Sequence, residues 1–196
     1  MQQRSVFMVD SIKEAATRIL KEQGVEGFNT NAVAEKAGVS IGSLYQYFGS
    51  KEALIAQIKR EHFSQLRLLL KQAQESLQTD MLSELVDAFV NASVKGHLID
   101  PDLHRVLSRD LGGFEIKEKD DSDDSILVKG KQALAAYKNQ LRHNLDIDAA
   151  AEIVYYLVEK TVHDTILNQR DPAKQNEVID ELKILVMTYL SADMSE

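Results

Sequence analysis

Between residues 40 and 48 the sequence places uncharged side chains that suit hydrogen bonding and close approach to another molecule. Ser43 can donate or accept a hydrogen bond, and Gln46 offers the paired donor and acceptor that match the edge of adenine. Ile41 can make only apolar contact, for instance with a thymine methyl group, and Gly42 leaves the backbone uncovered. These residue types predict contact with nucleic-acid bases and phosphates. The full set of predicted DNA-contact residues is Thr30, Asn31, Ser40, Ile41, Gly42, Ser43, Tyr45, Gln46, Tyr47 and Lys51.

Two short helices joined by a tight turn must hold these residues. Val39 and Leu44 would hold the second helix against the first, with Val33 in the same core, and Ala34 is small enough for the helices to cross closely. Gly38 would end the first helix in the left-handed conformation that glycine adopts without a Cβ clash. Such a turn presents the second helix to a DNA major groove, although glycine-linked helix pairs also occur in ordinary α-bundles. The predicted N-caps of the three successive helices are Thr30, Ser40 and Ser50.

The segment GVSIGSLYQYFGSKEAL, residues 38–54, resembles the signature of the TetR family of transcriptional regulators. That signature usually reads G-V-S-x-G-[ST]-[LI]-Y-x-[YH]-F-x-[SN]-K-x-x-L. Ile41 departs from the family, in which many members carry a lysine, an arginine or a small polar residue at this place. The departure leaves the operator sequence open, but it does not change the expectation of DNA binding. The matched positions are Gly38, Val39, Ser40, Gly42, Ser43, Leu44, Tyr45, Tyr47, Phe48, Ser50, Lys51 and Leu54.

The resemblance implies an all-α fold of about nine helices in two domains. A DNA-binding domain of three helices would occupy residues 1–50, with the helix-turn-helix at about residues 29–48. A linking helix would follow at residues 51–75, and residues 76–196 would form a larger ligand-binding and dimerisation domain. The implied function is a repressor that binds a palindromic double-stranded DNA operator as a homodimer and responds to a small-molecule effector. No cofactor is expected.

Apolar periodicity is helical along the rest of the chain. The first helix is predicted to run from about Val9 to Gly24, and the linking helix to begin near Lys51. Residues 115–125, EIKEKDDSDDS, are predicted to form a solvated loop, with a metal site as the less favoured alternative. A calcium loop would need a central glycine and a final glutamate, and this segment has neither. Further helices are predicted near residues 81–97, 101–112, 124–144, 148–169 and 173–191.

The last two predicted helices carry apolar stripes that are too broad for burial on one side. In the TetR family the two C-terminal helices pair with their copies to form a four-helix dimer interface. The alternative is an ordinary internal core. The residues predicted for the dimer interface are Ile153, Leu157, Val162, Ile166, Leu182, Leu185, Val186 and Tyr189.

Tyr137, Tyr155 and His163 could supply polar contacts to an effector in an apolar cavity, although such residues are more often part of a core or interface. Glu159 and His163 lie four residues apart, which predicts a surface pair or part of the dimer seam. The five histidines form no HExxH or E-x-x-H metal motif. The sequence also lacks the G-x-S-x-G, P-loop and Rossmann motifs. We therefore expect neither a metal site nor an enzyme.

Charge is divided unevenly along this chain of 196 residues with a net charge of −8. Residues 1–60 carry eight Lys or Arg against six acids, a balance of +2, so the remainder carries −10. That division suits a domain that tolerates phosphates and a body that they repel. The absence of cysteine excludes a disulfide scaffold. Because no apolar run approaches the ~18–20 residues that span a bilayer, we predict a cytoplasmic protein without membrane contact.

Two other functions remain open on the sequence. The protein could be a helix-turn-helix regulator that is controlled by a protein partner or is constitutive, with no small-molecule inducer. An exposed apolar patch in place of an enclosed cavity would favour that function. The chain could also be a helical binding protein or enzyme whose helix-turn-helix no longer reads DNA. A folded dimer that binds no duplex would favour this last possibility.

Overall fold

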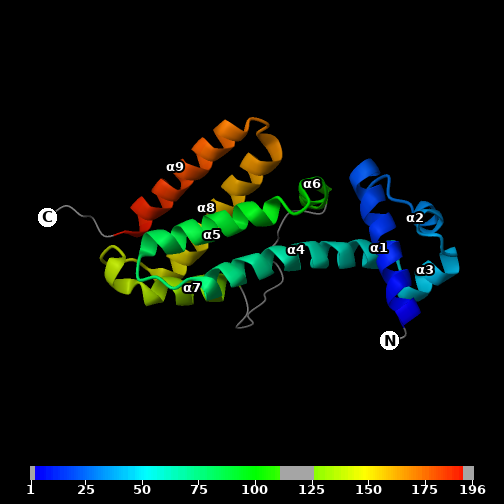
Figure 1. The fold of residues 1–196 in the computed structure, drawn as a ribbon, viewed down its shortest axis with the longest axis horizontal. Helices are drawn as coiled ribbons and strands as arrows, with labels where there is room; N and C mark the ends of the chain where they lie inside the picture. Colours follow the sequence, from blue (N-terminus) through cyan, green and yellow to red (C-terminus); the bar gives the residue numbers. More distant parts are fainter. Residues whose placement is uncertain (1–2, 111–125, 192–196) are drawn as a thin grey trace. The chain divides into compact units, whose positions relative to one another are not determined.

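The computed structural model describes residues 3–110 and 126–191, and every regular element within them is helical (Figure 1). This confirms the predicted all-α fold. The predicted loop at residues 115–125 lies outside the described residues. The elements are α1 (Gln3–Gln23), α2 (Thr30–Ala37), α3 (Ile41–Tyr47), α4 (Lys51–Ser76), α5 (Leu82–His97), α6 (Pro101–Asp110), α7 (Ile126–Ala136), the short 3-10 helix η1 (Lys138–Gln140), α8 (Ile147–Asn168) and α9 (Pro172–Leu190).

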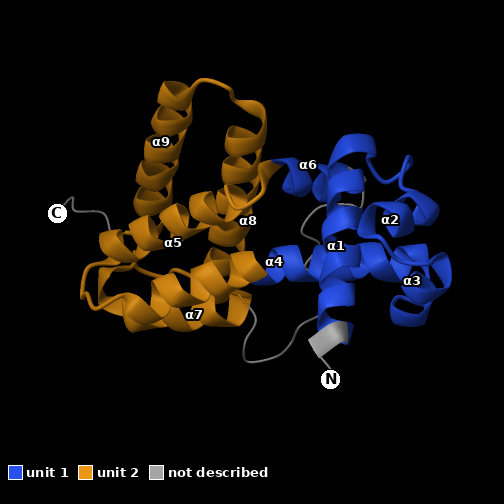
Figure 2. Ribbon diagram, turned by 45° about the vertical axis from the view of Figure 1, so that its right-hand side comes forward, with its two compact units in different colours: residues 1–64, 102–115 blue, residues 65–101, 116–196 orange. Residues whose placement is uncertain are grey.

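The helices group into two compact units (Figure 2). Unit 1 comprises residues 1–64 and 102–115, and unit 2 comprises residues 65–101 and 116–196. The division falls inside α4, so the first half of this helix belongs to unit 1 and the second half to unit 2. Helix α6 joins the N-terminal helices in unit 1. Periodicity along the sequence could not predict that grouping, because it depends on which helices meet in space.

The core of unit 1 lies where α1, α2, α3 and the first half of α4 meet. Helix α2 packs against both α1 and α3. Val33 and Leu44, both predicted for the core of the helix pair, are fully buried, and Ala34 at the crossing is buried with them. Val39, predicted to pack beside Leu44, is half-buried. The other large buried side chains here include Ile12, Ile19, Leu20, Leu54 and Ile58.

Helix α1 begins at Gln3, well before the predicted start at Val9. Its first turns carry Val6 and Phe7, which are exposed, so they add nothing to the inward apolar stripe that guided the prediction. The predicted end is confirmed. Gly24 takes a left-handed φ of 68°, and its amide donates to the Leu20 carbonyl at 2.9 Å.

A buried histidine pair attaches α6 to α4 within unit 1. His62 Nε2 and His104 Nδ1 lie 2.9 Å apart, and both rings are buried. The Phe63 ring meets both imidazoles edge-on, with centroids 5.3 and 5.4 Å away. One imidazole must donate and the other must accept in this hydrogen bond.

Unit 2 is built around an apolar core that α5, α7, α8 and α9 enclose. Side-chain caps start two of these helices: Asp146 accepts from the Ala149 amide at 3.0 Å, and Asp171 accepts from the Ala173 amide at 3.0 Å. Pro172 follows as the first residue of α9, where no backbone donor is needed. The core residues include Leu82, Val86, Val90, Val158, Val162, Leu182, Val186 and Leu190.

A glycine allows α4 and α5 to approach closely in unit 2. A Cβ atom added at Gly96 would lie 2.0 Å from Leu66 Cδ1, and Leu66 is itself buried. Leu66 occupies the space that a side chain at position 96 would need. The second half of α4 is therefore seated directly on α5 at the turn that precedes His97.

The helix predicted for residues 124–144 is shorter in the structure. Helix α7 ends at Ala136, η1 follows, and Asn144 adopts a left-handed φ of 61°. The Gln140 side chain accepts from the Leu82 amide at 2.9 Å, which anchors this connection to α5. Leu141 is buried and forms an isolated bridge with Ser191. Apolar spacing alone could not reveal the break, because Leu141 is buried by a non-helical contact.

Candidate nucleic-acid interface

The start of α2 is capped by Asn29, which corrects the prediction that Thr30 is the cap. The Asn29 side chain accepts from the Asn31 amide at 2.8 Å, and Asn29 has extended backbone angles. Thr30 is instead the first residue of the helix. Its hydroxyl lies 3.0 Å from the Tyr45 hydroxyl. This contact joins the start of α2 to the outer face of α3.

The turn between α2 and α3 has the predicted form. Gly38 takes φ 68° and ψ 30°, and its amide donates to the Glu35 carbonyl at 3.1 Å. The Val39 amide donates to the Ala34 carbonyl at 3.0 Å, which closes the end of α2. A residue with a Cβ would be strained at this φ even though the space around Gly38 is open.

Helix α3 begins at a serine cap, as predicted. The Ser40 hydroxyl accepts from the Ser43 amide at 3.0 Å and lies 2.8 Å from the Ser43 hydroxyl. Leu44 is the buried anchor of the helix. The outward residues Ile41, Gly42, Tyr45, Gln46 and Tyr47 are all exposed.

Gly42 has no role in packing within the described residues. A Cβ built at this position would meet only the Ser40 hydroxyl oxygen, 3.8 Å away, which is an ordinary contact. Glycine in a helix costs about 0.5–1 kcal/mol relative to alanine. The fold therefore gains nothing from glycine at position 42. A molecule that binds close to the start of α3 would explain why position 42 is a glycine.

Tyr47 is exposed and Lys51 is half-buried, and both side chains contact other segments of unit 1. The Tyr47 hydroxyl lies 3.9 Å from Met8 Sδ on α1. Lys51 Nζ donates to the Val25 carbonyl at 3.3 Å and lies 5.7 Å from the centroid of the Phe28 ring. Lys51 thus holds the α1–α2 connection against the start of α4, a structural role that its place in the sequence motif did not reveal.

Ser50 caps the start of α4, as Asn29 and Ser40 cap the starts of α2 and α3. The Ser50 hydroxyl accepts from the Ala53 amide at 3.1 Å, as predicted for an N-cap. Hydrogen bonds to its own backbone amide and to Ser50 lower the pKa of the exposed Glu52 carboxyl. The start of α4 therefore keeps a carboxylate beside its positive end.

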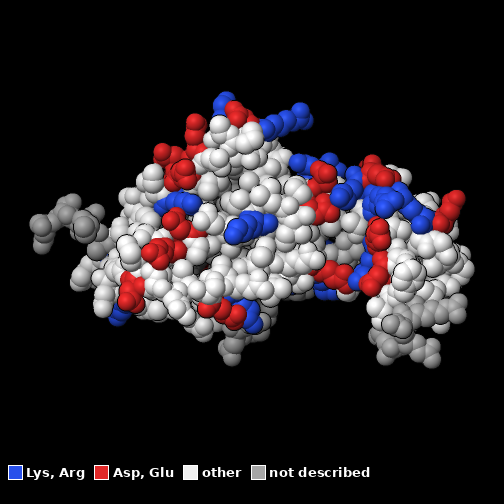
Figure 3. Space-filling view, in the orientation of Figure 1, with Lys and Arg blue, Asp and Glu red and all other residues white. Residues whose placement is uncertain are grey.

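Ion pairs neutralise several cations of unit 1. Lys36 Nζ on α2 lies 3.1 Å from a Glu22 carboxylate oxygen. Lys13 lies 3.0 Å from Glu61 and 3.2 Å from Asp10. Burial opposes the charged form of Lys13, but hydrogen bonds to these two acids outweigh it and raise its pKa. Over α3 the visible surface carries almost no charged side chains (Figure 3). Contact at α3 would thus rely on hydrogen bonds and shape more than on charge.

Two family models match the chain and decide its family. Residues 12–58 match the model described as "Bacterial regulatory proteins, tetR family". Residues 82–190, more than half of the chain, match the model described as "Tetracyclin repressor-like, C-terminal domain". The chain belongs to the TetR family. Members of this family are DNA-binding transcriptional regulators, and α2, the turn at Gly38 and α3 form the helix-turn-helix of this TetR-family chain.

Relatives of this TetR-family chain are similar over most of their length. The "HTH-type transcriptional regulator PksA" of Bacillus subtilis is 23% identical over 190 residues, which cover 92% of this chain and 87% of PksA. The "Fatty acid metabolism regulator protein" of the same organism is 23% identical over 180 residues, which cover 86% of this chain and 88% of that protein. Both are regulators by name.

Solved structures share the fold. NalD, the secondary repressor of the MexAB-OprM multidrug efflux pump in Pseudomonas aeruginosa, superposes with a TM-score of 0.71 at 22% identity, covering 98% of this chain and 100% of NalD. The fatty acid degradation regulator FadR from Bacillus halodurans superposes with a TM-score of 0.69 at 19% identity, covering 91% and 97% of the two chains. At these identities the likeness establishes the fold. Within the described residues, no helix is both long enough and apolar enough to cross a membrane.

The predicted dimer residues fall into two groups in unit 2. Val162, Leu182 and Val186 are buried in the core of their own chain, so these three are corrected to core residues. The helical spacing of these apolar residues fits burial in the core of the chain as well as burial at a dimer interface. Ile153 and Leu185 are exposed on α8 and α9. Leu157, Ile166 and Tyr189 are partly buried against the core.

The predicted ligand residues do not share one environment. The Tyr137 hydroxyl donates to the Thr79 carbonyl at 2.8 Å. Tyr155 is buried on α8, where burial and then the negative charge of Glu159 raise the pKa of its hydroxyl well above the usual range. His163 Nδ1 lies 3.3 Å from the neighbouring Asp164 carboxylate.

Sequence reasoning missed the centre of a polar cluster between α5 and α8. His97 is fully buried, with Nδ1 2.9 Å from the Ser93 carbonyl and Nε2 3.4 Å from a Glu159 carboxylate oxygen. Its ring meets the His163 ring edge-on at 5.8 Å. Glu159 therefore faces α5 rather than forming the predicted surface pair with His163. No spacing signal connects residues so far apart in the chain.

Proposed function

We propose that this protein is a ligand-responsive repressor that binds a palindromic operator as a homodimer. The observation that carries the DNA-reading part is the outward face of α3. It is exposed, uncharged and capped by side chains, and it has a glycine at position 42 that packing does not require. These properties suit insertion into a major groove.

Within that surface we assign base contacts to the first two turns of α3. Gln46 would pair with adenine, Ile41 would contact a thymine methyl, and Gly42 would let the backbone approach base edges. Ser43 keeps hydroxyl capacity beyond its contact with Ser40, so it can also reach a base or a phosphate.

Phosphate contacts are assigned to the residues around α3. The positive end of α2, at Thr30 and Asn31, favours anions. Ser40 and the hydroxyls of Tyr45 and Tyr47 would donate to neighbouring phosphates, and Lys51 would add a charge. These contacts position α3 and carry no sequence information of their own.

We assign the dimer interface to the outer faces of α8 and α9. Ile153 and Tyr156 on α8 and Ile184 and Leu185 on α9 are about half exposed, an unusual density of large apolar side chains at a surface. Burying these side chains against a second copy would remove the unfavourable contact of apolar surface with water. Two copies would then present two α3 helices to half-sites about one turn of DNA, ~34–36 Å, apart.

For ligand response we assign a role to α8. The Tyr155 hydroxyl feels the negative charge of Glu159, and the His163 ring meets that of His97, so a small molecule that contacts this cluster would act on α5 and α8 together. Gly96 seats α4 on α5 next to His97, which offers a route from the cluster to the linking helix. The ligand must prefer the state in which the two reading helices no longer match the half-site spacing.

Selection of bound sequences from a random duplex library tests this proposal. The purified full chain is used at physiological salt, together with a Gly42→Leu variant that fills the space beside α3. Enrichment of a palindrome with half-sites one helical turn apart by the parent, and of nothing by the variant, is expected. No enrichment by a folded dimer, even after unfolding and refolding free of bound ligand, would contradict it.

A further inference from the structure

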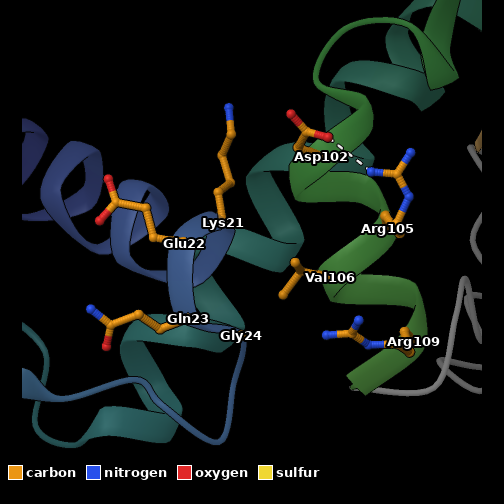
Figure 4. A pocket seen from close by; sticks show the side chains of 8 residues that line it. All are labelled: Lys21, Glu22, Gln23, Gly24, Asp102, Arg105, Val106 and Arg109. Carbon is orange, nitrogen blue, oxygen red and sulfur yellow. Dashed lines mark hydrogen bonds and ion pairs between the residues drawn. The ribbon is translucent and has the colours of Figure 1, made fainter.

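The two ends of α1 have different surroundings within unit 1. At its last turn, Gln23 and the following Gly24 line a depression together with Val106 of α6 (Figure 4). At its start, the Phe7 side chain is 72% exposed, the largest exposed fraction among the large apolar residues that the structure describes, and its neighbour Val6 is exposed as well. Exposed apolar residues are common on protein surfaces, so the position of Phe7 has to indicate what it contacts.

The start of α1 lies against the end of α3. The Tyr47 hydroxyl lies 3.9 Å from Met8 Sδ, so the residue next to Phe7 contacts the reading helix directly. Tyr47 is itself exposed, and its hydroxyl is one of those assigned to the phosphates around α3. A DNA strand that passes Tyr47 would therefore also pass beside the first turns of α1.

The distribution of charge along α1 limits such a contact to its first turns. The sequence carries no charged residue from Ser5 to Val9. Asp10 and Glu14 follow three and seven residues after Phe7, which places them on the same side of the helix, and both are exposed. Exposed carboxylates do not attract phosphates. Only the uncharged first turns of α1 are therefore suited to lie close to a duplex.

We propose that Phe7 contacts the minor groove that flanks the half-site read by α3, with its ring against the sugars that line the groove. This proposal rests on the proposed function, in which α3 lies in the major groove. A minor groove lies across one phosphate strand from the major groove, and a DNA-reading unit can contact both. Phenylalanine is among the apolar residues that proteins place in minor grooves. The contact would extend each half-site beyond the base pairs that α3 reaches.

Affinity for two duplexes tests the proposal. Both contain the operator obtained by selection. One continues for about five base pairs, roughly half a helical turn, beyond each half-site, and the other ends at the half-sites. Each is titrated with the full chain at the same salt concentration, and binding is followed by fluorescence anisotropy.

Three variants are compared with the parent. Phe7→Gln removes the ring but keeps a residue that forms helices well, and Phe7→Leu keeps an apolar side chain. Leu68→Gln changes an exposed leucine of α4 and serves as the matched control. Thermal unfolding checks that each variant folds, and sedimentation compares its oligomeric state with that of the parent.

On the longer duplex, Phe7→Gln should bind about tenfold more weakly than the parent, and Phe7→Leu less than about threefold more weakly, because it still buries apolar surface. Leu68→Gln should bind as the parent does. On the shorter duplex, Phe7→Gln and the parent should bind equally, because the groove that Phe7 contacts is no longer present.

Four results would overturn the proposal. Unchanged binding of Phe7→Gln to the longer duplex would overturn it alone, since binding by the parent would still support the proposed function. An equal loss on both duplexes would show that the ring acts through α3 and not on the flanking groove. A changed oligomeric state of Phe7→Gln would place the ring between two copies of the chain. A folded parent that binds no duplex would overturn this proposal and the proposed function together.

Discussion

The outward face of α3 and the cluster between α5 and α8 use polar residues in opposite ways. On α3 the side chains are exposed and uncharged, and Ser40 and Leu44 fix the helix beneath them. Between α5 and α8, His97 is fully buried against the Glu159 carboxylate. A change on the first surface should alter what the protein binds while leaving folding intact. A change in the second should alter how unit 2 holds together.

The largest expected effect concerns the apolar surface that we assign to the dimer. Ile153→Lys combined with Leu185→Lys places two charges on exposed positions, so each unit should still fold. Sedimentation should show a monomer, and operator affinity should fall by about 1,000-fold or more, because central interface residues contribute about 2 kcal/mol or more each. Leu68→Lys, which charges an equally exposed leucine of α4, is the control. A double variant that still sediments as a dimer would place the interface elsewhere.

The next effect tests the buried cluster. His97→Ala should lower the free energy of unfolding by about 2–4 kcal/mol, because it opens a cavity and removes the contacts to Ser93 and Glu159. Urea denaturation measures this change. At a temperature where the variant remains folded, its affinity for operator should stay within about twofold of the parent. A loss below about 0.5 kcal/mol, within the range of ordinary surface substitutions, would mean that the cluster does not support unit 2.

Lys51→Ala probes a residue that is assigned to DNA contact and that also stabilises unit 1. It removes the hydrogen bond to Val25 and the contact with Phe28, so unfolding should become easier by about 1 kcal/mol. Operator affinity should fall as well, and its salt dependence should weaken by about one phosphate contact. An unchanged salt dependence with reduced stability would limit Lys51 to its structural role.

The comparison also explains which features could be predicted. The reading helix follows from adjacent residues: Gly38, Ser40 and Leu44 determine the turn, the cap and the anchor, and all three are confirmed. The cluster in unit 2 depends on His97 and Glu159, which meet only because α5 packs on α8. The apolar spacing of α8 and α9 likewise predicts helices, but it does not tell whether an apolar side chain faces the core of its own chain or a second copy. Val162, Leu182 and Val186 face the core.

Tyr45→Phe should give the smallest effect. It removes the hydroxyl that lies 3.0 Å from Thr30, in an exposed contact that adds only about 0.5 kcal/mol to stability. The same hydroxyl is assigned to a phosphate, so operator affinity should fall severalfold without a change in the preferred sequence. Filter binding on the selected operator and on a one-base variant measures both. A changed base preference would show that Tyr45 reads bases.

The most direct test of the reading helix is Gly42→Ala, measured for stability and operator affinity in the same preparation. Among the described residues the added methyl group meets only Ser40, at 3.8 Å, so unfolding should become harder by about 0.5–1 kcal/mol. Operator affinity should fall about tenfold or more, since the methyl group would stand between the backbone and the base edges. Greater stability together with unchanged affinity would contradict the account, because DNA would then not approach α3 at this position.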